Sequence, residues 1–120
     1  ALAVAMGLTR EQYVTLLPKS VTTAISMDVA AELGGIAALT GAIVILTGIA
    51  GNLLAETVGK VFHITDPIAK GVGIGTSAHA VGTSKALQMG EVEGAMSGLS
   101  IAVAGVLTAV LCPVFVNFIN

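Results

Sequence analysis

Charged and aromatic residues are scarce in this sequence. Only 10% of its 120 residues are Asp, Glu, Lys or Arg, whereas an ordinary soluble domain has about 25%. Aromatic residues make up 3%, tryptophan is absent, and the formal net charge is −2. Nucleic-acid binding requires a basic face and usually aromatic rings that stack on bases. The composition therefore excludes a nucleic-acid partner.

Cysteine is also scarce, since Cys112 is the single one and no intrachain disulfide can form. Cys112 lies in an apolar run, which predicts a packed, unreactive thiol. A zinc site needs three or four Cys, His or carboxylate ligands, and neither His63 nor Cys112 is placed to join His79. No metal or other cofactor is therefore predicted.

Patterns typical of enzymes are missing as well. No Ser-His-Asp order and no exposed cysteine with a neighbouring base suggests a nucleophile, so no catalytic residue is predicted. Residues 73–78 fit G-x-G-x-x-A, but no β-rich strand precedes them, as a dinucleotide site would require. The sequence predicts that the protein is not an enzyme.

Hydrophobic residues, in contrast, make up 55% of the chain, and the mean hydropathy is +0.97. No charged residue occurs from Leu33 to Ala55 or from Gly94 to Asn120. Each of these runs exceeds the roughly 20 residues that a helix needs to cross a membrane. The fold class that we predict is an all-α, multi-pass membrane helix bundle.

The chain begins with ALAVAMG, which has neither the basic region nor the cleavage site of a signal peptide. These residues resemble the last turns of a membrane helix. We therefore expect residues 1–120 to be a single transmembrane domain that forms the C-terminal part of a longer chain.

Local signals predict the first helices. Thr9 is a suitable N-cap for a short helix that ends at Pro18, and a second helix is expected to restart at Lys19. Hydroxyl residues gather where that second helix begins. The first full span is predicted from Ile36 to Ala55.

The most charged stretch runs from Glu56 through Lys60 to Lys70 and predicts a loop where the chain leaves the membrane. Within it, Asp66 followed by Pro67 is a typical helix start. The last span is predicted over residues 94–116, with two glutamates in the turn before it.

Residues 71–90 are too polar for a lipid-facing helix and too apolar for a solvated linker. We expect a helix interrupted between Gly75 and Ala78 and buried in the bundle, because non-helical backbone in a membrane must line protein or water. Broken or re-entrant helices are therefore part of the predicted fold, and the site is predicted here.

A shift of sixty residues aligns Gly34 with Gly94 and Leu39 with Leu99. This weak internal repeat covers residues 8–58 and 66–118, and each unit contains short helix, break, short helix and long span. The pattern predicts inverted repeats, in which half-helix starts point at an anionic substrate near the membrane midplane.

Two residues of the broken helices have alternative interpretations. His79 is either a structural histidine bonded to a backbone carbonyl or a residue that binds substrate or couples a proton. Lys85 either neutralises a bound carboxylate or instead reaches the interface or pairs with Glu91 or Glu93. Lys19 has the same alternatives.

Hydroxyl groups near both breaks are candidate donors to a substrate, although hydrogen bonds between helices would also explain them. The predicted substrate-binding residues are Lys19, Ser20, Thr22, Thr23, Thr76, Ser77, His79, Gly82, Thr83 and Lys85.

The motifs PKSVTT and GTSAHAVGTSKAL resemble those of the LrgB/CidB family of bacterial membrane proteins, and the resemblance extends from Gly7 to the end. Ala24 departs from the family, whose members commonly carry proline there. The residues that match the family motifs are Lys19, Ser20, Thr22, Thr23, Gly75, His79, Gly82, Thr83 and Lys85.

The resemblance implies a multi-pass protein of the cell inner (plasma) membrane that is linked to murein hydrolase control and lysis. Plant relatives resemble glycolate/glycerate translocators, and bacterial members are connected with pyruvate movement. Our leading hypothesis is a carrier for such monocarboxylates, with a proton cotransported through His79. The alternative is a non-transporting, antiholin-like regulator that assembles with a holin-like LrgA/CidA partner. Gly90, Gly94 and Gly98 form a smooth stripe that would suit an oligomer.

Overall fold

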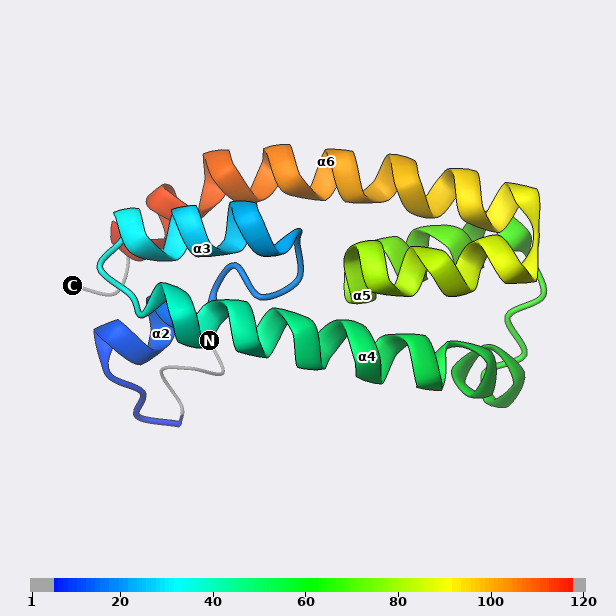
Figure 1. Cartoon of the computed structure of the whole chain (residues 1–120), viewed down its shortest axis with the longest axis horizontal. Coiled ribbons are helices and arrows are strands. Elements are labelled where there is room, and N and C mark those ends of the chain that lie inside the picture. The colour runs from blue at the N-terminus through cyan, green and yellow to red at the C-terminus, as the bar shows by residue number, and fades with distance from the viewer. Residues whose placement is uncertain (1–5, 118–120) are drawn as a thin grey trace.

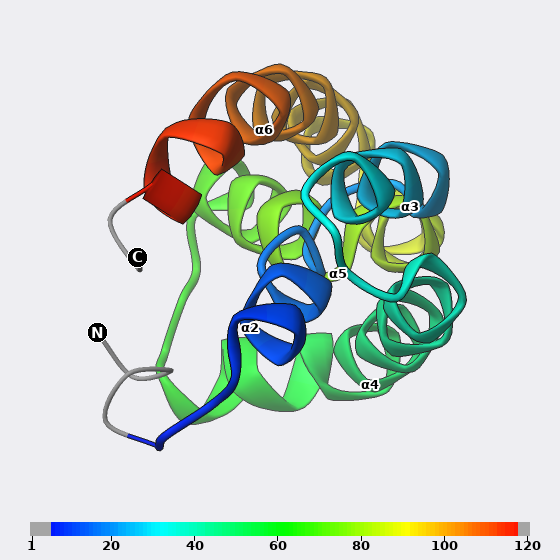
Figure 2. The same cartoon turned by 90° about the vertical axis from the view of Figure 1, so that its left-hand side faces the viewer.

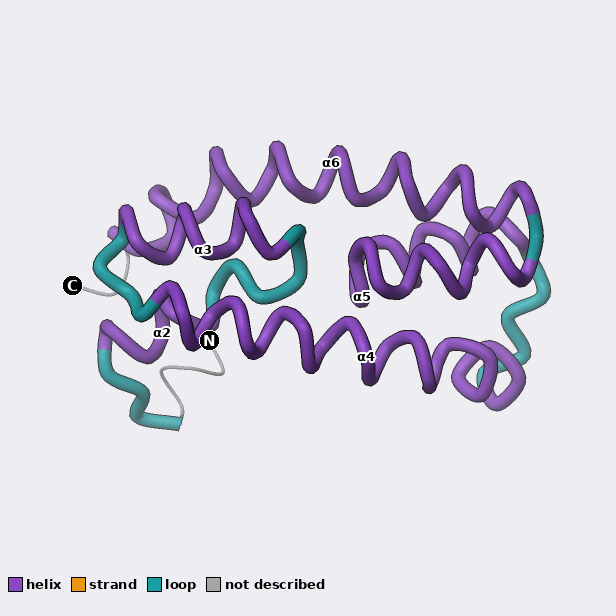
Figure 3. Tube along the Cα trace, in the orientation of Figure 1, coloured by secondary structure: helices purple, strands orange, loops and turns teal. Residues whose placement is uncertain are grey.

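The computed structural model describes residues 6–117, which form five helices and no strand (Figures 1 and 3). The prediction of an all-α fold is confirmed. The expected helix tail over residues 1–7 lies mostly outside the described residues. The helices are α2 (Arg10–Leu16), α3 (Thr23–Glu32), α4 (Ala37–Val61), α5 (Pro67–Met89) and α6 (Glu91–Val116).

The two long helices, α4 and α6, run in opposite directions along the molecule (Figure 1). They contain 25 and 26 residues, so at about 1.5 Å per residue both exceed a hydrocarbon core of about 30 Å. Within the described residues, these two helices are long and apolar enough to cross a membrane. Leu53 and Val106 are 73% and 67% exposed. Such an outward apolar surface suits lipid, and both predicted spans are confirmed as helices.

Helix α5 folds back on itself at His79, whose φ of 42° and ψ of −139° are not helical. A Cβ atom on Gly82 would lie 2.9 Å from Cγ2 of Ile74, although eight residues of straight helix span about 12 Å. Residues 67–78 and 80–89 therefore form a re-entrant hairpin whose two ends lie at the same end of the molecule (Figure 1).

The predicted break position between Gly75 and Ala78 is wrong by at least one residue. Gly75 remains helical because its bare backbone packs on Ser97 of α6, and Ala78 remains helical against Gly51 of α4. The chain reverses only at His79, whose backbone leaves the helical region.

Helices α2 and α3 form a second hairpin. Thr9 caps α2 as predicted, in a capping box with Gln12. The restart predicted at Lys19 is wrong, since α3 begins at Thr23 with Thr22 as its N-cap. The Ser26 hydroxyl donates to the carbonyl of Pro18 at 2.6 Å, which holds the intervening residues in a loop.

The two hairpins enter from opposite ends and meet near the middle of the long helices (Figure 1). The end-on view shows α3 between α4 and α6 (Figure 2). On α4, Gly41 lies against Thr23, and Gly48 lies against His79. Seven residues of helix separate these glycines, which corresponds to two turns and about 10 Å. The start of α3 and the break of α5 therefore lie along one face of α4. The internal repeat itself remains a prediction.

The loop predicted from Glu56 to Lys70 is limited in the structure to Phe62–Asp66. Helix α4 continues to Val61, so Glu56 and Lys60 are helical and form an i,i+4 pair at 3.8 Å. Lys60 also suits the negative end of the α4 dipole. The predicted helix start is confirmed, because Asp66 caps α5 and Pro67 is its first residue.

The glycine stripe on α6 is used largely within the chain. Gly94 is buried against Leu87 of α5, whereas Gly98 faces open space. Glu91 and Glu93 lie in the first turn of α6, as expected. The close helix contact that the stripe predicts is therefore partly intramolecular.

Two neighbouring glycines of α5 should respond oppositely to alanine. Gly75→Ala places a Cβ against the backbone oxygen of Ser97, and we expect this overpacking to destabilise the protein by about 1–3 kcal/mol. Gly73→Ala meets open space and should stabilise the helix by up to about 1 kcal/mol. Unfolding measured in detergent micelles tests both, and equal effects would contradict the packing described.

Candidate functional site

His79 anchors the break of α5 to α4. His79 is 2% exposed, and its ring atom Nε2 lies 2.8 Å from the carbonyl oxygen of Val44. A carbonyl can only accept, so Nε2 carries a hydrogen and donates it in this contact. This geometry fits the structural alternative for His79. A positive φ outside glycine costs about 1–3 kcal/mol and persists only where surrounding contacts fix it.

Thr83 connects the same break to α6. Its hydroxyl donates to the carbonyl oxygen of His79 at 2.9 Å and lies 2.7 Å from the hydroxyl of Ser97. Because Thr83 has a single hydrogen, the buried Ser97 hydroxyl is the donor in the second contact. Thr83 thus ties the start of the second half-helix to α6.

Asn52 of α4 supports the second half of α5. Its Nδ2 atom donates to the carbonyl of Val81 at 2.9 Å and to the hydroxyl of Ser84 at 3.2 Å. Sequence reasoning missed both Asn52 and Ser97. Asn52 could have been found, because it is the one amide side chain in the uncharged run from Leu33 to Ala55.

Lys85 pairs with Glu56 across the α4–α5 contact. The two charged atoms are 2.5 Å apart, and the Lys85 side chain is 24% exposed. The suggested pairing with Glu91 or Glu93 is therefore wrong. The error follows from placing Glu56 in a loop, whereas the longer α4 brings it alongside the second half of α5.

The other predicted substrate-binding residues of α5 make contacts within that helix or its hairpin. The hydroxyls of Thr76 and Ser77 turn back to their own helix, to the carbonyls of Val72 and Gly73 at 2.7 and 2.6 Å. Gly82 packs inside the α5 hairpin against Ala78.

At the start of α3 the donors remain available. Thr22 is an N-cap without a side-chain capping bond, and Thr23 is the first helical residue. Lys19 is exposed and donates to the hydroxyl of Ser20 at 3.0 Å. Lys19, Ser20, Thr22 and Thr23 thus lie together at the tip of the α2–α3 hairpin. His79, Gly82 and Thr83 lie at the tip of the α5 hairpin.

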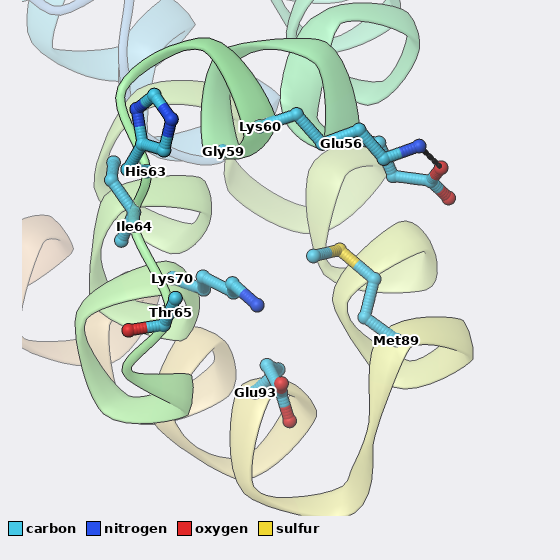
Figure 4. A pocket seen from close by; sticks show the side chains of 9 residues that line it. All are labelled: Glu56, Gly59, Lys60, His63, Ile64, Thr65, Lys70, Met89 and Glu93. Carbon is cyan, nitrogen blue, oxygen red and sulfur yellow. Dashed lines mark ion pairs between the residues drawn. The ribbon is translucent and has the colours of Figure 1, made fainter.

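A cavity of about 460 Å³ lies where α4 ends and α6 begins (Figure 4). The figure shows the Lys70 side chain directed into this space, with Glu93 on the facing helix and the pair Glu56–Lys60 at its rim. The residues that line it are Glu56, Gly59, Lys60, His63, Ile64, Thr65, Lys70, Met89 and Glu93.

An adjoining groove of about 300 Å³ runs between α4 and the first half of α5. It shares Gly59, Ile64 and Lys70 with the charged cavity, and its other lining residues are mostly apolar, including Leu54 and Val58. Within residues 6–117, no three His, Cys, Asp or Glu side chains gather closely enough to hold a metal ion.

Reversal of charge tests the contact between Lys85 and Glu56. Lys85→Glu should lower the melting temperature in detergent, because two carboxylates then face each other beside the apolar span. Adding Glu56→Lys to the same chain should recover most of the loss. No recovery in the double variant would show that the pair does not contribute to stability.

Comparison with known proteins matches residues 1–118 to the LrgB-like family. Proteins named "Antiholin-like protein LrgB" from Bacillus mycoides (strain KBAB4), Bacillus cereus (strain B4264) and Bacillus anthracis (strain CDC 684 / NRRL 3495) are each 39% identical over 118 residues. These alignments cover 98% of this chain and 51% of each relative, so the chain spans about half the length of the curated relatives. No solved structure gives a significant match. The chain therefore belongs to the LrgB-like family.

Proposed function

We propose that this protein is an inner-membrane carrier for small monocarboxylates such as glycolate, glycerate or pyruvate. The observation that supports the proposal is the pair of hairpins that enter from opposite ends, so that two half-helices start near the middle of α4 and α6 (Figure 1). Helix starts concentrate unpaired N–H groups and partial positive charge, which stabilise an anion. Inside a membrane, such starts are a recurring way to bind anionic substrates.

The start of α3 offers donors that the fold itself does not use. Thr9 and Asp66 cap α2 and α5 with their side chains, but Thr22 makes no such bond to α3. A carboxylate could therefore accept from the first amides of α3 and from the hydroxyls of Thr22 and Thr23. Lys19 would add charge, because no carboxylate pairs with it among the described residues, whereas Lys85 is already paired.

The tip of α5 would form the other side of the binding site. The His79 ring reaches across to α4 and does not cap the half-helix that follows it. In this proposal the amides after His79 face the substrate, and Thr83 holds their geometry through its bond to the His79 carbonyl. In this proposal, atom Nδ1 of the ring accepts the cotransported proton.

Uptake into proteoliposomes by the full chain tests the assigned site. Wild type should show saturable uptake of labelled pyruvate or glycolate, and Thr22→Val should raise KM roughly tenfold, because a hydrogen bond to a charged group contributes about 1.5–3 kcal/mol. Thr57→Val is the matched control, since Thr57 is exposed near the other end of α4. Saturable uptake with an unchanged KM in Thr22→Val would remove Thr22 from the site.

The regulator hypothesis is the second candidate, and the name of the relatives, antiholin-like, favours it. In that case Gly98, which faces open space on α6, would lie in the surface that contacts a small holin-like partner or a second copy.

Tagged protein purified from membranes distinguishes the two candidates. If the protein is a regulator, a small membrane partner should co-purify, Gly98→Leu should release it, and vesicles should take up none of the short acids. Uptake without any such partner would contradict this candidate.

A further inference from the structure

If α4 and α6 cross a membrane, the charged cavity between Lys60 and Lys70 lies near its surface. It is formed by the last turns of α4, the first turn of α6 and both ends of α5. The two long helices change here from apolar to charged residues, and α4 is long enough for its end to leave the hydrocarbon core. Lipid headgroups occupy this depth.

The charge of the cavity favours an anion. Glu56 is shared between Lys60 and Lys85, so that cluster retains one positive charge. Lys70 forms no ion pair among the described residues, and its side chain points into the cavity opposite Glu93 (Figure 4). The charged side chains that line the cavity, Glu56, Lys60, Lys70 and Glu93, sum to zero, and Lys85, which pairs with Glu56 from outside the lining, brings the group to one positive charge.

The groove continues from this cavity toward the membrane interior. Both spaces are lined by Gly59, Ile64 and Lys70, so they adjoin one another. A methyl group added at Gly59 or Gly73 would meet no other atom within 4 Å, which leaves the groove floor open. A ligand that fills both spaces must have a negatively charged head and a long apolar part.

We propose that the cavity and groove bind an anionic phospholipid. The phosphate lies between Lys60 and Lys70, and one acyl chain lies in the groove between α4 and the first half of α5. Basic pockets between membrane helices are known to hold anionic headgroups. A free phosphate or carboxylate would use only the charged cavity and would leave the groove empty. The site is separate from the helix tips of the proposed carrier.

Native mass spectrometry of the full chain in detergent tests the lipid site. Phosphatidylglycerol should bind at least about fivefold more tightly than phosphatidylcholine, and Lys60→Gln with Lys70→Gln should remove this preference, since each lysine contributes about fivefold. Lys19→Gln, at an exposed lysine of the other hairpin, should leave it unchanged. Equal binding of the two lipids to wild type would overturn the proposal.

A second pair of variants tests the groove. Gly73→Leu projects a side chain into the groove and should weaken phosphatidylglycerol binding roughly tenfold, because an acyl chain loses several buried methylene groups. Gly98→Leu makes the same change on the open face of α6 and should have no effect. Full binding by a folded Gly73→Leu protein, or displacement of the lipid by equimolar glycerol phosphate, would contradict an acyl-chain site.

Discussion

The structure depends on one constraint, which is that backbone groups released from a helix inside lipid must find partners within the protein. At the reversal of α5, side-chain donors reach carbonyl groups of the second half-helix. Thr83 donates to the carbonyl of His79, and Asn52 and Ser84 donate to that of Val81. Asn52 of α4, together with Ser97 of α6 bonded to Thr83, therefore ties the reversal to both long helices.

Glycine makes such close support possible. Gly48 of α4 leaves room for the His79 ring, and Gly75 of α5 lets that helix contact the backbone of Ser97. In a membrane, small residues replace the hydrophobic effect as the basis of helix association, because apolar side chains gain little by leaving lipid. The glycines that weaken an isolated helix thus allow the hairpin to be enclosed.

Local rules were sufficient for the features that local chemistry decides. The caps at Thr9 and Asp66 and the two uncharged spans follow from short stretches of sequence. The position of the break and the partner of Lys85 could not be predicted, because they depend on Ser97 and Glu56, which approach only in the folded bundle. The substrate residues stay a prediction. The paired breaks suggest that residues near each break gather at a helix tip, but Thr76, Ser77 and Lys85 are engaged elsewhere.

Helix α5 returns to the end of the molecule where it began. This determines which connections lie on the same side of the membrane. If α4 and α6 cross the bilayer and α5 does not, the Phe62–Asp66 connection and Gly90 face one compartment. Gly34 before α4 and Asn117 after α6 then share the opposite compartment. Any topology map that counts the 23 residues of α5 as a crossing would assign Asn117 to the wrong side.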